Sequence, residues 1–219
     1  PNVLFRNRRD GTFEDVGARA RVADPRCSVA ATWLDFDRDG HIDLYVGNYI
    51  RFDPTYNLYY APDGFPGPLA YAAESDALYR NRGDGTFEDV TERTGITGAG
   101  RAMTVAAADL DDDGFDDIYV SNDAMVNFLY RNEGGVRFRE DALDAGVAYN
   151  SAGDSTSHMA VDFGDYDSDG KLDIFVSDSS ISSLFHNEGK GMFNDVSVPA
   201  GVGRMSAQFV GWGSFFFDF

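Results

Sequence analysis

From residue 34 the chain reads Leu34-Asp35-Phe36-Asp37-Arg38-Asp39-Gly40-His41-Ile42-Asp43-Leu44-Tyr45-Val46. The core of this stretch is the pattern D-x-D-x-D-G-x-x-D followed by apolar or aromatic residues, and it returns from Asp109 and from Asp165. What looks like the opening of a fourth copy stands at Asp218. A pattern that recurs at such intervals is the signature of a repeat architecture.

A second motif accompanies the first, and in it a leucine and an aromatic residue precede a cationic residue and an asparagine. A glycine-rich turn and a phenylalanine follow each copy, as in Asp84-Gly85-Thr86-Phe87. The four copies are Leu4-Phe5-Arg6-Asn7, Leu78-Tyr79-Arg80-Asn81, Leu129-Tyr130-Arg131-Asn132 and Leu184-Phe185-His186-Asn187.

The first complete repeat predicts four short strands, over residues 29–34, 42–47, 77–81 and 86–90, joined by turn-forming residues. Four strands in about 55 residues are typical of a β-propeller blade. We therefore expect an all-β chain, a β-propeller of four-stranded antiparallel blades. The predicted divisions are a partial blade 1–27, a blade 28–99 with an insertion at 49–71, blades 100–153 and 154–203, and the start of a further blade at 204–219.

Two readings of the blade count stay open. The chain is either an arc of about four blades from a larger propeller, or its two partial ends complete one blade of a small ring. The second reading lacks a strand and its metal loop, so the first is preferred. The insertion carries Pro54, Pro62, Pro66 and Pro68 with several tyrosines, which indicates an irregular surface excursion.

Each aspartate loop has the chemistry of a calcium site. Ca²⁺ takes six to eight oxygen ligands, and a D-x-D-x-D-G loop offers carboxylates at positions 1, 3 and 5, a sharp turn at the glycine and a carbonyl at position 7. An aspartate at position 9 closes the cage here. The predicted ligands are Asp35, Asp37, Asp39, the His41 carbonyl and Asp43; Asp109, Asp111, Asp113, the Phe115 carbonyl and Asp117; Asp165, Asp167, Asp169, the Lys171 carbonyl and Asp173; and Asp218 in the partial fourth copy.

Other interpretations of the loops are weaker. Aspartate-rich turns without a metal would crowd four carboxylates into nine residues with no counter-ion. Magnesium prefers few carboxylates and several waters. Zinc and copper favour histidine or cysteine, and the loops hold neither as a plausible side-chain ligand. We expect three Ca²⁺ ions, one for each complete loop.

Composition excludes some function classes. The formal net charge is −19, which repels nucleic-acid phosphates and anionic lipid headgroups. No apolar run approaches the ~20 residues of a membrane span. Cys27 is the single cysteine, so no intrachain disulfide forms, and we expect it in the core. Trp33 and Trp212 are also expected in the core.

The motifs together resemble FG-GAP/VCBS repeats, as in integrin α-subunit propellers. The stretch from Leu78 to Val90, Gly95-Ile96 and the stretch from Val210 to Phe219 narrow the resemblance to bacterial relatives in the cartilage acidic protein-like, ASPIC/UnbV group. The resemblance implies a seven-bladed propeller with structural calcium loops and an ASPIC/UnbV domain beyond these residues. It also implies an extracellular, cell-surface or periplasmic location. It implies no catalytic residue.

Three functions remain open. The first is an extracellular binding, scaffold or adhesion module for a protein or glycan. The second is a carbohydrate-active enzyme at the propeller channel, for which His158 and Asp154 are the candidates, although a structural role for His158 is preferred. The third is an accessory subunit of a larger surface or membrane-associated complex. His186 replaces the arginine of the other copies and is expected on the blade surface.

Overall fold

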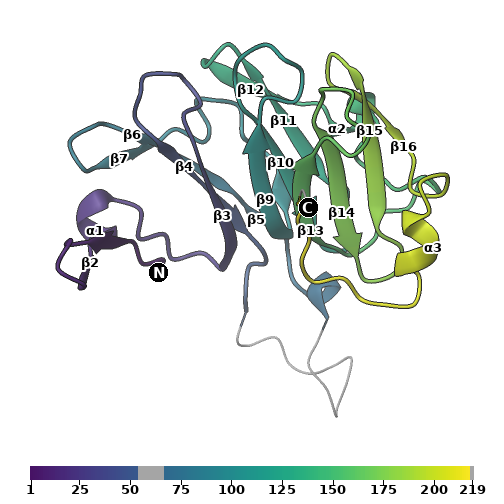
Figure 1. Cartoon of the computed structure of the whole chain (residues 1–219). Coiled ribbons are helices and arrows are strands. Elements are labelled where there is room, and N and C mark those ends of the chain that lie inside the picture. The colour runs from purple at the N-terminus through teal and green to yellow at the C-terminus, as the bar shows by residue number, and fades with distance from the viewer. Residues whose placement is uncertain (54–66, 218–219) are drawn as a thin grey trace.

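The computed structural model describes residues 1–53 and 67–217, and these form an all-β chain of antiparallel sheets with a few short helical turns. Within these two ranges, three sheets have four strands and two small ones have two. Figure 1 shows the three larger sheets side by side in chain order. The predicted all-β class and the four-stranded antiparallel sheets are confirmed.

The first sheet contains β3 (Ser28–Leu34), β4 (Asp43–Asn48), β6 (Ala77–Asn81) and β7 (Phe87–Asp89) in that order. The second contains β9 (Ala102–Ala108), β10 (Asp117–Asn122), β11 (Phe128–Glu133) and β12 (Arg137–Glu140). The third contains β13 (His158–Gly164), β14 (Asp173–Asp178), β15 (Ser183–Gly189) and β16 (Met192–Asp195). All neighbouring strands are antiparallel, so each sheet is a simple meander.

The meander brings two connections of each sheet to the same end. The link between the first and second strands and the link between the third and fourth strands both leave from that end, while the link between the second and third strands lies at the other. The aspartate loops are the first-to-second links. The cation and the asparagine of the second motif stand at the end of the third strand, so the topology returns them to the loops.

Smaller elements make up the rest of the assigned structure in the described ranges. The hairpin of β1 (Phe5–Asn7) and β2 (Phe13–Asp15) precedes the first sheet, and β5 (Glu74–Ser75) pairs with β8 (Ala99–Gly100). The helical turns are α1 (Gly17–Ala20), η1 (Pro68–Ala70), α2 (Ala142–Ala145) and α3 (Val202–Ser206). None of the helices within the described ranges is long and apolar enough to cross a membrane.

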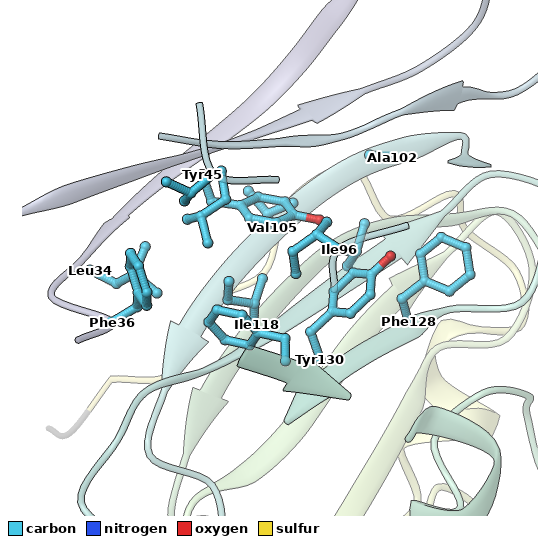
Figure 2. Packing of buried hydrophobic residues seen from close by; sticks show 13 residues of the cluster. Leu34, Phe36, Tyr45, Ile96, Ala102, Val105, Ile118, Phe128 and Tyr130 are labelled. Carbon is cyan, nitrogen blue, oxygen red and sulfur yellow. The ribbon is translucent and has the colours of Figure 1, made fainter. Parts of the chain in front are cut away.

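Apolar side chains fill the spaces between neighbouring sheets, because successive residues of a strand point to opposite faces. In β10, Ile118 and Val120 pack toward the first sheet, whereas Tyr119 packs toward the third. Figure 2 shows the cluster between the first two sheets, where Tyr45 and Tyr130 approach with ring centroids 6.5 Å apart. The second sheet is therefore covered on both faces.

Three core predictions are wrong. Trp33 is 50% exposed and Trp212 is 69% exposed, and Cys27 is also exposed. Trp33 lies on the face of β3 that is turned away from the second sheet. Its ring lies 6.3 Å from the Phe87 ring, but half of the residue stays exposed to solvent. Trp212 lies in residues 207–217, which follow α3 without an assigned strand.

The C-terminal described residues run beside the third sheet. The amide of Gly211 donates to the Asp178 carbonyl at 3.0 Å, and the amide of Phe216 donates to Asp162 Oδ2 at 2.5 Å. The Phe216 ring meets Phe175 edge-on at 6.3 Å. The segment thus lies along β13 and β14. The divisions predicted for the individual blades stay predictions.

Candidate metal centre

The three aspartate loops share one backbone conformation. Position 4, filled by Arg38, Asp112 and Ser168, has a positive φ in every loop, and so does the glycine at position 6. Gly40, for example, has a φ of 83°, a value that side chains strongly disfavour. The glycine of the pattern is therefore required by the turn itself.

The same hydrogen bonds hold each loop. In the first loop, Asp35 accepts from the amides of Asp39 at 3.1 Å and Gly40 at 3.0 Å, while Asp39 accepts from the amide of His41 at 2.9 Å. The second and third loops repeat these contacts within about 0.2 Å. The sequence pattern therefore specifies one local structure three times.

Each loop gathers carboxylate oxygens close enough to share an ion. One oxygen from each of three residues lies within 4.8 Å of the others, and the three groups are Asp35, Asp37 and Asp39; Asp109, Asp111 and Asp113; and Asp165, Asp167 and Asp173. An all-oxygen, carboxylate-rich donor set suits a hard cation such as Ca²⁺. The residues present fit that ion.

The aspartate at position 9 is buried in every loop and ties the loop to its sheet. Asp43 accepts from the amide of Asn81 at 2.7 Å, and Asp117 and Asp173 accept from the equivalent asparagines at 2.8 Å. Burial raises the pKa of Asp43 to about 6 and that of Asp117 to about 7, and nearby loop carboxylates add to the effect. A bound cation would offset that cost of ionisation.

A cation from the third strand reaches each loop, and sequence reasoning missed this contact. Arg80 bridges Asp37 through Nε at 2.5 Å and Asp39 through Nη2 at 2.6 Å. Arg131 lies 3.1 Å from Asp117 and 3.5 Å from Asp111. The signal was present in the sequence, because a cationic residue precedes the asparagine in all four copies of the second motif.

In the third loop a histidine takes the place of the arginine. His186 Nε2 lies 3.1 Å from Asp167 Oδ2 and 3.7 Å from Asp169 Oδ2, and its Nδ1 lies 3.2 Å from Glu188. Burial lowers the pKa of His186, but the hydrogen bond with Glu188 and the nearby carboxylates outweigh it, so the pKa is raised. His186, expected on the blade surface, therefore lies in β15 and contacts the third loop.

The asparagine that ends the motif joins neighbouring sheets. Asn132 Nδ2 donates to the Phe36 carbonyl at 2.9 Å, across to the first loop, and Asn187 Nδ2 donates to the Leu110 carbonyl at 2.9 Å, across to the second loop. Each of these loops is therefore held both by its own sheet and by the next one.

Several predicted ligands remain predictions. The close groups contain side-chain atoms alone, so the backbone carbonyls of His41, Phe115 and Lys171 stay predicted ligands. Asp218 lies outside the described residues. Position 9 joins the close carboxylate group only in the third loop. Lys171 has a role that was not foreseen, because its Nζ contacts Asp169.

The two residues considered for catalysis are differently placed. His158 is fully buried at the start of β13, where its Nε2 lies 3.7 Å from Asp178 and 3.2 Å from the Thr156 hydroxyl. Burial lowers the pKa of His158, and Asp178 partly opposes that shift. Asp154 is exposed.

Comparisons with known proteins agree with the repeat pattern. A model of the FG-GAP-like repeat matches residues 1–46, 69–120 and 110–176. Cartilage acidic protein 1 of Mus musculus is 31% identical over 185 residues, which are 81% of this chain and 25% of the mouse protein. The Homo sapiens protein is also 31% identical, over 81% of this chain and 24% of its own length. The chain thus spans about a quarter of these relatives.

A solved structure offers a weaker likeness. It is an Agrocybe aegerita lectin, described as recognising non-reducing terminal N-acetylglucosamine, and the match has a TM-score of 0.35 at 17% identity. It covers 88% of this chain and 59% of that one. A TM-score this low supports no conclusion. The family match and the cartilage acidic proteins instead confirm the resemblance inferred from the loops: the chain belongs to the FG-GAP-like repeat family and is homologous to cartilage acidic protein 1.

Proposed function

We propose that the chain is an arc of a β-propeller whose three aspartate loops each bind one Ca²⁺, and that it acts outside the cytoplasm as a binding or scaffold module for a protein or glycan. The observation that carries the calcium proposal is the threefold carboxylate cluster on one backbone conformation. Each cluster stands at the same end of its sheet, so the ions would form a row along one edge of the molecule.

The arrangement of the sheets supports the propeller. The first strands of the sheets, β3, β9 and β13, are neighbours in space, as the innermost strands of successive blades are. The Thr104 hydroxyl of β9 donates to the Met159 carbonyl of β13 at 2.7 Å, which joins two of these strands directly. The β1–β2 hairpin matches the third and fourth strands of a preceding blade.

Calcium gives the module rigidity in this proposal. The loops hold many negative charges close together, and the third-strand cations neutralise only part of them. A divalent ion would neutralise the rest and fix the ends of two strands in each sheet. Calcium modules with weak sites suit an extracellular setting, where dissociation constants of ~10⁻⁴–10⁻³ M are typical.

The partner surface is proposed at the opposite end, which bears the longest connection. The described flanks of that connection are anchored, because the Tyr49 hydroxyl donates to Asp123 of the second sheet at 2.6 Å and the Phe52 ring lies 5.8 Å from the Tyr71 ring. Phe52 and Leu69 remain well exposed. Exposed apolar side chains beside an anchored loop base are suited to contact. The predicted Tyr- and Pro-rich insertion itself lies mostly in 54–66, outside the described residues.

Calcium binding is tested by counting ions with isothermal titration calorimetry in wild type and two matched variants. Asp111 and Asp112 are adjacent and carry the same charge, but only Asp111 belongs to the predicted ligand set. We expect three sites in wild type, two in Asp111→Asn and three in Asp112→Asn. Equal loss in both variants would show general charge screening, and no site in wild type would defeat the proposal.

Thermal unfolding provides the second readout. A ligand that binds only the folded chain stabilises it by about 2.7 kcal/mol per site at a hundredfold excess over its dissociation constant. We expect a large rise in the melting temperature with millimolar Ca²⁺ that excess chelator reverses. The binding role is tested on protein and glycan arrays, where Phe52→Ala and Leu69→Ala should weaken any signal while Asp112→Asn leaves it unchanged.

A further inference from the structure

The third loop differs from the others in chemistry as well as in sequence. Two elements contribute to one cluster: β15 provides His186 Nε2, and the loop between β13 and β14 provides Asp167 Oδ2 and Asp169 Oδ2. Their ligand atoms all lie within 4.8 Å of one another. The first two loops present Arg80 and Arg131 at this place, and a guanidinium has no lone pair for a metal.

The spacing of these atoms suits a small tetrahedral ion. Zinc bonds to histidine nitrogen and carboxylate oxygen at about 2.0–2.2 Å, so two ligands of a tetrahedral site lie about 3.4 Å apart. The distances from His186 Nε2 to the two carboxylate oxygens are 3.1 and 3.7 Å, on either side of that value. These two distances are compatible with one cation bound between the imidazole and both carboxylates.

The imidazole is also held in the orientation that a metal ligand needs. Glu188 Oε1 lies 3.2 Å from His186 Nδ1 and accepts from Asn194 Nδ2 at 2.8 Å, so Glu188 has a second partner. The ring of Tyr166 meets the imidazole edge-on at 5.9 Å. When Nδ1–H donates to Glu188, the Nε2 lone pair faces Asp167 and Asp169. Histidine ligands of metals are typically oriented by such a carboxylate.

We propose that the third loop binds a borderline transition-metal ion of the Zn²⁺ class through His186 Nε2 and the Oδ2 atoms of Asp167 and Asp169, with Glu188 as the positioning residue and water at the open position. The proposal differs from the sequence-based expectation because the histidine comes from β15 and not from the loop itself. The inference does not rest on calcium binding, although Ca²⁺ and Zn²⁺ would compete for Asp167 and Asp169 in this loop.

The Lys171 ammonium competes with the metal ion for Asp169. Lys171 Nζ contacts Asp169 Oδ2, so the ammonium occupies an oxygen that the ion needs. Lys171 is a flexible surface side chain and can turn toward solvent, at the cost of one exposed ion pair. Removal of this competitor by Lys171→Met should therefore strengthen Zn²⁺ binding severalfold.

The test is a titration of the metal-free chain with ZnCl₂, followed by calorimetry and by the ¹⁵N shift of the His186 ring. Wild type should bind one Zn²⁺ with a shift at Nε2. His186→Arg, which restores the residue type of the other loops, should weaken binding at least tenfold, and Glu188→Gln should weaken it by about 10–100-fold. Asp112→Asn is the control, because Asp112 is exposed and lies outside every proposed ligand set, and it should leave Zn²⁺ binding unchanged.

The outcomes separate clearly. Equal Zn²⁺ binding by wild type and His186→Arg, or the absence of a ring shift in wild type, would overturn the proposal. If His186→Arg does not fold, as judged by circular dichroism, the wild-type ring shift and the Glu188→Gln affinity decide the matter. Calcium counts at the second loop with Asp111→Asn do not involve these residues, so failure of the zinc site leaves the calcium proposal standing.

Discussion

The first and second sheets carry the same repeat but differ in what covers the cation of the third strand. Arg80 meets the first loop and is 33% exposed, whereas Arg131 meets the second loop and is 6% exposed. The difference comes from the next sheet along, because the turn before β16 places the Gly191 carbonyl on the Arg131 guanidinium. The motif sets the contacts within a repeat, and the neighbouring sheet sets how much they contribute to stability.

The largest expected effect tests that comparison directly. Arg131→Ala leaves the buried Asp117 without its cation, and breaking a buried pair in this way costs about 3–5 kcal/mol. Arg80→Ala breaks more exposed pairs and should cost less than about 1 kcal/mol. Urea unfolding of both variants in excess chelator measures the difference. Similar losses would mean that coverage by the third sheet does not matter.

A smaller difference is expected for the asparagines that follow these arginines. Asn132 is buried and donates to carbonyls of both the first and the second loop, so Asn132→Ala should cost about 1–3 kcal/mol. Asn81 donates to the Ile42 carbonyl of its own loop and is more exposed, so Asn81→Ala should cost less. The free energy of unfolding from urea titrations checks the order, and the reverse order would rule out the bridge between sheets as the reason.

A third comparison between these sheets depends on pH. Asp76, directly before β6 of the first sheet, accepts from the Tyr45 hydroxyl at 2.7 Å and from the Asn48 amide at 2.7 Å. In the second sheet the equivalent hydrogen bond runs from the backbone amide of Asn122 to the Asn127 side chain. Burial raises the pKa of Asp76 to about 7. The folded chain therefore retains a proton that the unfolded chain releases, and the stability contributed by this group falls as pH rises from about 4 to 7.

Asp76→Asn removes the titrating carboxyl group, so the loss of stability at higher pH should disappear. We expect the variant to match wild type near pH 4 and to melt about 3 °C or more above it at pH 8. The other carboxylates titrate in both proteins and cancel in the difference. Asn127→Asp in the second sheet is the matched reverse change and should introduce the same pH dependence there. A difference between wild type and Asp76→Asn that does not vary with pH would contradict the raised pKa.

Local features were predictable from the sequence, and contacts between distant residues were not. The strand predicted over 77–81 is β6 as observed, because turn residues and alternation mark both of its ends. The contact of Arg80 with Asp37 joins residues 43 apart and depends on the meander, which no local pattern reports. Trp33 was misjudged for a related reason, since alternation shows that a residue faces one side of a strand but not whether anything covers that side.

The asparagine bridge has a consequence for how such chains change length. The second repeat carries both halves of the bridge, because the Leu110 carbonyl accepts from the repeat after it and Asn132 donates to the repeat before it. Duplication or deletion of one whole repeat therefore leaves every junction with a donor and an acceptor. A duplication that begins between the loop and the asparagine would still join matching halves, provided that it spans one full period. A duplication or deletion must therefore keep the length of one repeat, whereas the position at which the repeat is cut is free.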